Sequence, residues 1–248
     1  MKKEKPSGKI LLLGERSFIA DIAQKKFSTN YGLLDLTKIK KYGQVLKSNT
    51  GHEFVVLKPT ILDLLRKAKR MPQIIMPKDA GQIAAHTGVS SGWHCLDAGT
   101  GSAFLSIFLG NIVKPSGSVT TYEKNKKFYE NAKRNIEFCG LAGTVNIKNK
   151  PAERFTEKNL DMITLDMIDA DKMVKKCKTA LKSGGWLCIY SPHIEQQKRA
   201  VKELEKNKFA QIKTISTQQV DWQVSDYTHP RPSQIVHTGF ITFGRKVL

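Results

Sequence analysis

Several kinds of sequence feature are scarce or missing in this chain of 248 residues, and each absence excludes a class of protein. No apolar run is long enough to span a bilayer, and the N-terminal stretch lacks a convincing signal-peptide cleavage region. We therefore expect a soluble protein of the cytoplasm without a membrane partner. The four cysteines form no CxxC pair and the six histidines form no HxxxH or mixed cluster, so we expect no bound metal.

Acidic residues are also in short supply. The chain has 22 Asp and Glu against 41 Lys and Arg, which gives a formal net charge of +19. A positive field of this size concentrates polyanions, so nucleic acid is the first partner to consider. Two alternatives stay open. The charge is also compatible with a generally lysine-rich proteome, and an acidic membrane surface competes less well because no strongly basic amphipathic helix is evident.

The pattern of the first 70 residues differs from that of the rest. Between Lys9 and Pro59, short β-type runs are separated by Gly, Asn and charged residues, and "SNTGHEF" is typical of a hairpin turn. A short helix follows from Thr60, its N-cap, to Arg70. We predict a small β-rich domain over residues 1–70 and a second domain over residues 71–248.

In the second domain, strand patterns alternate with helix patterns. We expect strands at residues 92–99, 117–123, 144–149, 160–167, 186–192, 209–216 and 237–245. We expect helices at residues 102–113, 127–139 with Gly140 past its end, 169–181 and about 194–206, and a turn at residues 182–185. Repeated βα units predict an α/β, Rossmann-like fold with a mostly parallel sheet and helices on both faces. The last two strands predict an antiparallel hairpin at the edge of the sheet.

The stretch "LDAGTGSAF" carries the first chemical signal. Gly99 and Gly101 fit the start of a dinucleotide fingerprint, but Phe104 occupies the third glycine position, and no Walker Gly-Lys-Ser/Thr is present. The carboxylate of Asp97 would face a pyrophosphate unfavourably. It suits a ligand with an ammonium group, such as S-adenosylmethionine, which also carries a sulfonium and no phosphate.

The next expected strand ends in Glu123, 24 positions after Gly99. A carboxylate there accepts hydrogen bonds from both ribose hydroxyls of an adenosine ligand. Nicotinamide dinucleotide sites use the same arrangement, so Glu123 alone does not select the methyl donor. The alternative is that Asp97 caps a helix and Glu123 is a solvated strand end.

Several segments together resemble one family, the tRNA (adenine-N1)-methyltransferases that modify position 58 of the T-loop. The resemblance covers nearly the whole chain. The segments are "GQVLKSNTGHEFVVLKP", "PQIIMPKDAGQI", "LDAGTGSAF", "YEKNKKFYENAKRNIEFCGL", "ITLDMID", "LKSGGWLCIYSP" and "RPSQIVHTGFI". The glycine motif is shared by many methyltransferases, whereas the combination of "PKD", "YSP" and "HTGF" is much more specific.

The resemblance implies a class I methyltransferase domain, S-adenosylmethionine as donor, and a homotetramer that grips tRNA. It implies that Asp97, Gly99, Thr100, Gly101 and Ser102 line the donor and that Glu123 holds its ribose. It also implies that Asp166 is the catalytic aspartate, with Tyr190 and His237 near the target base.

The chain departs from the family pattern at four places. Ala103 follows Ser102 where the family usually has a second glycine, and Met76 replaces a tyrosine expected beside the target adenine. No proline follows two positions after Asp166. The family's aspartate against the donor adenine is missing. Pro151 or Ala152 falls near its position, and Glu153 is the candidate substitute.

The chemistry implied for Asp166 is electrostatic. Adenine N1 has its own lone pair, so the site must mainly position it against the methyl group and stabilise the cationic product ring. Asp166 would accept a hydrogen bond from the exocyclic amine. The alternatives are that Asp166 caps the next helix, that Tyr190 is a core residue, and that His237 is structural. At the level of function, the alternatives are a non-catalytic tRNA-binding subunit and a protein-repair (isoaspartyl-type) or small-molecule methyltransferase.

Overall fold

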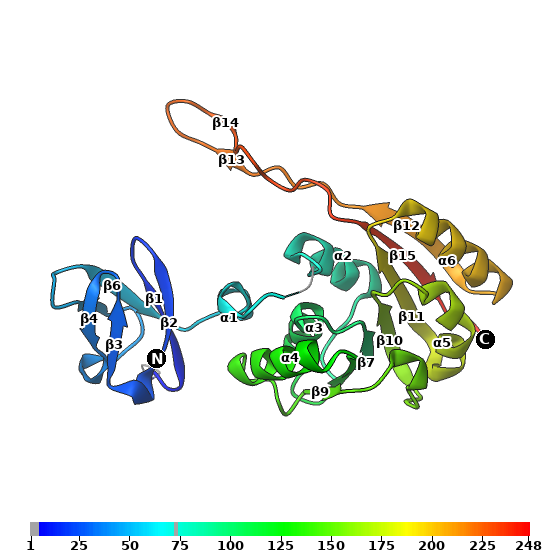
Figure 1. Ribbon diagram of the computed structural model, residues 1–248, viewed down its shortest axis with the longest axis horizontal. Coiled ribbons are helices and arrows are strands. Elements are labelled where there is room, and N and C mark those ends of the chain that lie inside the picture. Colours follow the sequence, from blue (N-terminus) through cyan, green and yellow to red (C-terminus); the bar gives the residue numbers. More distant parts are fainter. Residues whose placement is uncertain (1–4, 72–73) are drawn as a thin grey trace. The chain divides into compact units, whose positions relative to one another are not determined.

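The computed structural model describes residues 5–71 and 74–248. The chain divides into two compact units, Met1–Ala68 and Lys69–Leu248, and each is described by itself (Figure 1). None of the helices in these described ranges is long and apolar enough to cross a membrane.

The first unit is a small antiparallel β structure, as the sequence predicts. Its main sheet has the order β2 (Ser17–Asp21), β1 (Lys9–Leu13), β6 (Glu53–Leu57), β5 (Val45–Lys47). A hairpin of β3 (Lys26–Thr29) and β4 (Gly32–Asp35) and the 3-10 turns Ile22–Gln24 and Leu36–Lys38 complete it. Alternating residues of β1 and β6 form the core with Leu34, because successive side chains of a strand point to opposite faces.

Helix α1 (Ile61–Lys67) follows and begins where the sequence predicts. The hydroxyl of Thr60 accepts a hydrogen bond from the N–H of Asp63, and the Asp63 carboxylate accepts one from the N–H of Thr60. This capping box satisfies two donors that a helix N-terminus otherwise leaves unpaired.

The second unit is built on a seven-stranded sheet. Its order is β12 (Ala210–Ser216), β15 (Phe240–Arg245), β11 (Leu181–Ser191), β10 (Leu160–Leu165), β7 (His94–Ala98), β8 (Ser118–Tyr122), β9 (Val145–Lys148). The helices are α2 (Pro77–Thr87), α3 (Phe104–Val113), α4 (Lys126–Phe138), α5 (Val174–Ala180) and α6 (Ile194–Lys206). Two 3-10 turns, Ala152–Arg154 and Ala170–Met173, lie between them.

The strand order determines where a ligand can bind. Strands β11, β10, β7, β8 and β9 are parallel, and only β15 runs antiparallel, to both of its neighbours. The chain proceeds from β7 towards β9 and then returns to β10 on the other side of β7. Right-handed crossovers in the two directions place their helices on opposite faces. The carboxyl ends of β7 and β10 therefore flank the point where the order reverses, which is where open α/β sheets bind ligands.

Three features differ from the sequence-based expectation or were not anticipated. The expected turn at residues 182–185 is wrong as a boundary, because β11 runs through it as an irregularity with Gly184 at φ 82°. Helix α2 was not anticipated. The segment between β12 and β15, residues 217–238, forms a projecting arm that contains the short pair β13 (Trp222–Gln223) and β14 (His229–Pro230) (Figure 1). The expected edge hairpin of β12 and β15 is confirmed.

Candidate functional site

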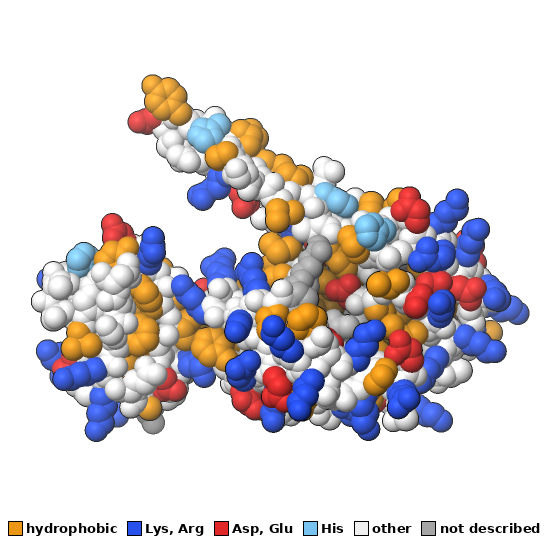
Figure 2. All heavy atoms as spheres, viewed as in Figure 1, with side chains coloured by type: hydrophobic (Ala, Val, Ile, Leu, Met, Phe, Trp, Pro, Cys, Tyr) orange, Lys and Arg blue, Asp and Glu red, His pale blue; other side chains and the backbone are white. Residues whose placement is uncertain are grey.

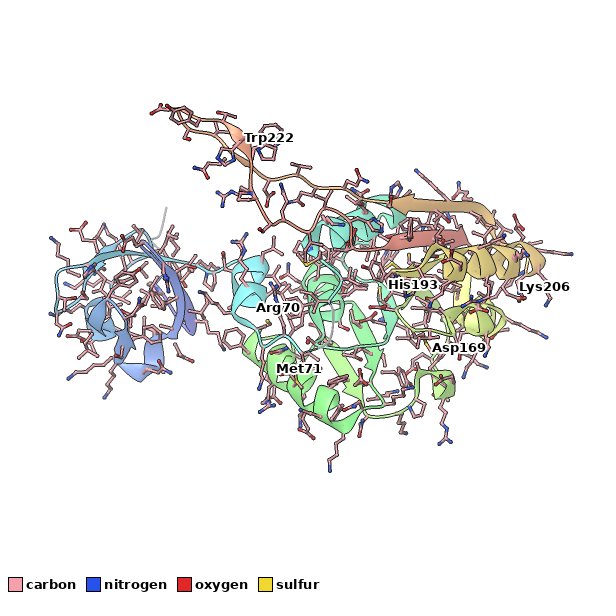
Figure 3. The ribbon with its side chains drawn as sticks, turned by 45° about the horizontal axis from the view of Figure 1, so that its top comes forward. Arg70, Met71, Asp169, His193, Lys206 and Trp222 are labelled. Carbon is pink, nitrogen blue, oxygen red and sulfur yellow. The ribbon has the colours of Figure 1, made fainter. Side chains whose placement is uncertain are left out.

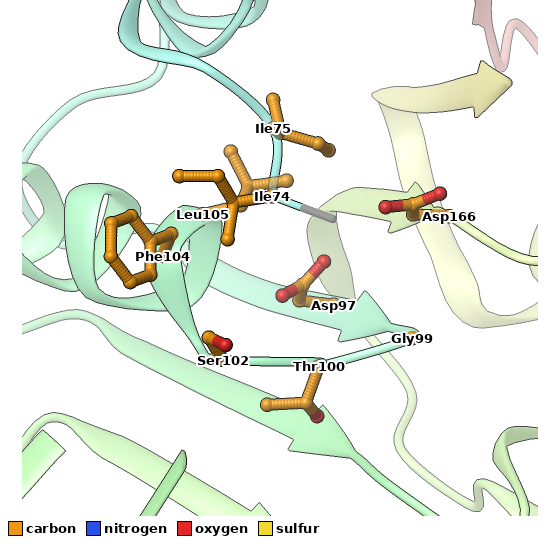
Figure 4. Close-up of a pocket in the computed structure, with 9 residues that line it drawn as sticks. All are labelled: Ile74, Ile75, Asp97, Gly99, Thr100, Ser102, Phe104, Leu105 and Asp166. Carbon is orange, nitrogen blue, oxygen red and sulfur yellow. The ribbon is translucent and has the colours of Figure 1, made fainter. Parts of the chain in front are cut away.

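Four segments bring the predicted side chains to one edge of the sheet. Gly99 follows β7, Glu123 follows β8, Asp166 follows β10, and Tyr190 lies near the end of β11. The pocket beside the glycine loop is lined by Asp97, Gly99, Thr100, Ser102, Phe104, Leu105, Asp166, Ile74 and Ile75. In Figure 4 the carboxylates of Asp97 and Asp166 reach into the same space from neighbouring strands.

The backbone at Gly99 approaches Asp166 so closely that only glycine fits. Gly99 has φ +91°, and a Cβ added there would lie 2.1 Å from the carbonyl oxygen of Asp166. The N–H of Asp166 in turn donates to the carbonyl of Ala98 at 2.8 Å. The glycine that a sequence motif requires is thus the residue that lets the end of β10 pack against the loop.

The remaining loop residues are held by their neighbours. The Thr100 and Thr121 hydroxyls are hydrogen-bonded at 2.6 Å. Ser102 accepts a hydrogen bond from the N–H of Met71 at 3.0 Å through its hydroxyl and one from the Asn135 amide at 2.9 Å through its carbonyl. Ala103 then opens α3 at φ +64°, a left-handed conformation that a non-glycine residue adopts at a cost.

Glu123 is buried and aimed back at the loop. Its carboxylate accepts hydrogen bonds from the N–H of Gly101 at 3.0 Å and from the N–H of Asn125 at 2.8 Å. A carboxylate can accept about four hydrogen bonds, so capacity is left for the two hydroxyls of a ribose. The alternative that Glu123 is a solvated strand end is wrong, because only 8% of the residue is exposed.

Asp97 is buried among hydroxyl groups. Its carboxylate accepts hydrogen bonds from Ser106 at 2.5 Å and Thr164 at 2.6 Å. Burial raises the pKa of Asp97, and these hydroxyls oppose the rise by stabilising the charged form. The alternative that it caps a helix is wrong for α3, which begins without a side-chain cap. A buried carboxylate at this position attracts a cationic ligand group.

Asp166 differs from Asp97 in having no such partners. Within residues 5–71 and 74–248, no hydrogen bond to its carboxyl group is present. Loss of hydration raises the pKa of Asp166 to about 7, and the nearby charge of Asp97 contributes in the same direction. The following 3-10 turn has no side-chain cap, so Asp166 does not serve as one. Its carboxylate remains available to a ligand.

A second cavity, of about 340 Å³, continues from the loop along the ends of β8 and β10. Glu123, Ala152, Glu153 and Ile168 line it together with Asp166. Ala152 is buried, whereas Glu153 is exposed at the rim. This places the two candidates for an adenine contact beside the candidate ribose ligand.

Tyr190 shares an opening with Asp166. It lines a third opening with Gly99, Phe128, Asp166 and Pro192. Its hydroxyl donates to the carbonyl of Thr238 at 2.9 Å, and burial raises the pKa of Tyr190 to about 12, so the phenol stays protonated at neutral pH. The alternative that Tyr190 belongs to the core holds in part, since only 4% of the residue is exposed.

Among the described residues, those that line these three openings do not include the two other predicted substrate residues. Met76 is the N-cap residue of α2, directly before "PKD". His237 is exposed and lies in the last residues of the arm, close to the start of β15. Its ring packs against that of Phe240 at a centroid distance of 4.9 Å.

Sequence reasoning missed two sets of residues. The hydroxyls of Ser106 and Thr164, which hold Asp97, carry no signal in the sequence. Lys78, Asp79 and Thr238 form a buried polar cluster next to Tyr190. Their motifs, "PKD" and "HTGF", were available as family signals, but nothing in the sequence shows that residues 160 positions apart touch.

Comparison with known proteins agrees with this geometry. The family model described as "tRNA methyltransferase complex GCD14 subunit" matches residues 54–238. The tRNA (adenine(57)-N(1)/adenine(58)-N(1))-methyltransferase TrmI of Methanocaldococcus jannaschii is 32% identical, over 95% of this chain and 94% of that protein. The tRNA (adenine(58)-N(1))-methyltransferase TrmI of Thermus thermophilus is 30% identical, over 82% of this chain and 81% of that protein.

Two solved structures resemble the whole chain. A SAM-dependent O-methyltransferase from Thermotoga maritima matches with a TM-score of 0.85 and 30% identity, over 99% of this chain and 95% of that one. The tRNA (m1A58) methyltransferase TrmI from Aquifex aeolicus matches with a TM-score of 0.78 over the full length of both chains. Its identity of 24% makes it a likeness of fold. The expected class I methyltransferase fold, preceded by a small β-rich sheet, is confirmed.

Proposed function

Because the chain belongs to the family of tRNA (adenine-N1)-methyltransferases, we propose that its site methylates N1 of adenine 58 in the T-loop of tRNA, with S-adenosylmethionine as donor. One observation carries the proposal. The carboxylate of Asp166 has no hydrogen-bond partner in the described chain and lines all three openings at the switch point of the sheet. A free carboxylate at this place suits a reaction in which a neutral base becomes a cation.

The residues of the site fit the donor. The buried carboxylate of Asp97 suits the ammonium group of its methionine, and the close backbone approach at Gly99, Thr100, Gly101 and Ser102 leaves room for its chain. Glu123 suits the ribose hydroxyls. Ala152 and Glu153, at the wall of the second cavity, suit the adenine. When bound, S-adenosylmethionine supplies an electrophilic methyl group.

The protein's own task is then to orient the target base. Adenine N1 attacks with its lone pair, so no proton has to leave first. Asp166 accepts a hydrogen bond from the exocyclic amine of the adenine and stabilises the positive charge as it develops, which favours the transition state over the ground state. Tyr190, which lines the same opening as Asp166, holds the base. Its two other proposed contacts are Met76, at the N-cap of α2, and His237, in the last residues of the arm.

The partners follow from charge and surface. We propose that the positive charge of +19 draws tRNA, and that the first unit adds phosphate contacts. Lysine and arginine side chains are spread over the visible face of the second unit (Figure 2). Trp222 lies on the arm and is 54% exposed (Figure 3). The arm also exposes Tyr227 (84%) and Ile235 (72%), an apolar surface suited to a second copy of the chain. We therefore propose a homo-oligomer, and by family resemblance a homotetramer. The proposed place of action is the cytoplasm.

Adenine 57 is the second candidate target. The name of the Methanocaldococcus jannaschii relative includes both positions, and the similarity to this relative covers 95% of the chain. We propose adenine 58 as the principal target and adenine 57 as an additional one.

Transfer of label from S-adenosylmethionine to tRNA transcripts tests the function. The transcripts carry adenine or guanine at positions 57 and 58, singly and together, and Asp166→Ala is run beside the wild type. We expect label only where an adenine is present, and at least a hundredfold loss with Asp166→Ala. Tight tRNA binding without label would favour a non-catalytic subunit, and label in isoaspartyl peptides but not tRNA would favour protein repair.

A further inference from the structure

The arm is anchored at its base by one buried ammonium group. Nζ of Lys78 donates to the carbonyl of Thr217 at 2.8 Å and to the hydroxyl of Thr238 at 2.8 Å. These two residues are the first and last of the arm, next to the ends of β12 and β15. A single side chain from the first turn of α2 therefore holds both legs of the arm.

A carboxylate completes this arrangement. Lys78 also donates to both oxygens of Asp79, at 2.9 and 3.1 Å, and the Thr238 hydroxyl donates to Asp79 at 2.5 Å. The side chain of Lys78 is 7% exposed and that of Asp79 is fully buried. We call Lys78, Asp79 and Thr238 the clamp. The hydroxyl of Thr238 accepts a hydrogen bond from Lys78 and donates one to Asp79, so the three side chains fix one another's positions.

The clamp continues directly into the substrate side of the site. The carbonyl of Thr238 accepts the hydrogen bond of the Tyr190 hydroxyl, and Tyr190 lines the same opening as Asp166. The next residue, Gly239, leaves no space, since a Cβ there would lie 2.7 Å from the Tyr190 hydroxyl. Any shift of the arm's second leg therefore moves the tyrosine.

A buried ion pair gives little net stability over an apolar replacement, and its best-attested use is to specify one arrangement of its surroundings. Here the arrangement specified is the path of both arm legs relative to Tyr190. We propose that Lys78, Asp79 and Thr238 are positioning residues that hold the arm in register with the base-binding side of the site. This proposal rests on the proposed function, because the object positioned is the tRNA base opposite Asp166.

Thr238 allows a mild test, because valine keeps its shape and removes only the hydroxyl, whereas serine keeps the hydroxyl. Thr238→Val leaves the Lys78–Asp79 pair intact, so the protein is expected to fold. We expect kcat for tRNA to fall at least tenfold, with the Kd for S-adenosylmethionine changed less than twofold, and Thr238→Ser to restore most of the rate. Thr214→Val removes a hydroxyl from the same hairpin outside the clamp and serves as the matched control.

Two further measurements separate positioning from a loss of folding and from a wrong substrate. Amide hydrogen exchange of peptides covering residues 217–221 and 236–240 should quicken in Thr238→Val and not in Thr238→Ser or Thr214→Val. In the double variant Thr238→Val/Tyr190→Phe, the losses in kcat should not add. Thr238→Val loosens the second leg of the arm and Tyr190→Phe removes the bond to the carbonyl of that leg, so both changes act on the position of the Tyr190 ring. Unchanged exchange and unchanged kcat in Thr238→Val would overturn the clamp. If exchange responds but wild-type protein methylates no tRNA, the proposed function fails while the anchoring of the arm stands.

Discussion

Asp97 and Asp166 are two carboxylates on neighbouring strands in one pocket, and their surroundings differ. Hydroxyl groups stabilise the charge of Asp97, whereas Asp166 has no partner in the described chain and its pKa lies near 7. In the proposed mechanism Asp166 acts in its charged form, so kcat/KM should rise with pH through about 7 as its proton leaves. In Asp166→Asn the rate should fall about 10²–10³-fold and lose this dependence. Initial rates between acidic and mildly basic pH test this, and an unchanged acid limb in the variant would exclude Asp166 as its source.

The same raised pKa predicts the pH dependence of stability. An ordinary aspartate, with a pKa of 3.8, loses its proton in the unfolded chain at lower pH than Asp166 does in the folded one. The favourable contribution of Asp166 to the free energy of unfolding is therefore complete below about pH 4 and is lost as the pH rises through about 7. Over this window the wild type should lose stability relative to Asp166→Asn, by at most about 4 kcal/mol. Denaturant unfolding at several pH values measures the difference, and a constant offset would contradict the raised pKa.

Gly99 is the other residue whose identity the site dictates. Gly99→Ala combines a φ of +91° with a clash at 2.1 Å against the Asp166 backbone, so the loop and the end of β10 must separate. We expect donor binding to weaken at least a hundredfold, measured by calorimetry. Gly81→Ala is the matched control. It lies inside α2 with open space around it, so alanine should stabilise the protein by about 1 kcal/mol. Equal donor affinity in both variants would show that the loop tolerates a Cβ.

At the scale of elements, two asparagines of α4 hold the backbone of Lys69, and one of them also holds the glycine loop at Ser102. Asn135 exchanges hydrogen bonds with the backbone of Lys69 and donates to the carbonyl of Ser102, and Asn131 donates to Lys69 as well. Asn135→Ala removes the acceptor of the part-buried Lys69 N–H and the donor to the buried Ser102 carbonyl, which costs about 1–3 kcal/mol. Donor affinity should fall as well, because Ser102 belongs to the loop. Lys133→Ala, on the exposed face of the same helix, should change stability by less than about 0.5 kcal/mol; comparable losses in both variants would refute the role of Asn135.

The elements also show what a sequence can and cannot predict. Strands β7, β8 and β10 are short runs rich in apolar and β-branched residues, and Asp97, Glu123 and Asp166 lie at or directly after their carboxyl ends. Local pattern and topology together therefore place these side chains. Helix α6 is expected from about Ile194 to Lys206 and is observed at Ile194–Lys206, because a helix-forming segment of this length has a recognisable pattern. The sequence of the arm has neither a helical nor a strand period. Its two strands pair over only two residues each, which is too short for such a period to be recognised. The contact of Lys78 with Thr238 depends on where α2 packs, which no local spacing encodes.

At the scale of the whole molecule, the charge of +19 predicts how the protein responds to salt. Each phosphate contact releases counterions, so binding of a polyanion that uses six or more contacts weakens by about 10³-fold between 50 and 200 mM salt. S-adenosylmethionine makes no phosphate contacts. We therefore expect the Kd for tRNA to rise steeply over this range while the Kd for S-adenosylmethionine changes less than twofold. Fluorescence titration of labelled tRNA and calorimetry of the donor give the two slopes.

The comparison of slopes also separates the candidate substrates. A small molecule or a short isoaspartyl peptide offers few charges, so its KM would stay nearly flat with salt. If kcat/KM for tRNA falls with salt as steeply as tRNA affinity does, the positive charge acts in substrate capture. If tRNA affinity is insensitive to salt, the lysines and arginines do not contribute to tRNA binding through phosphate contacts, and other contacts hold the tRNA. Because the net charge is +19 and the donor itself makes no phosphate contacts, we expect the first result.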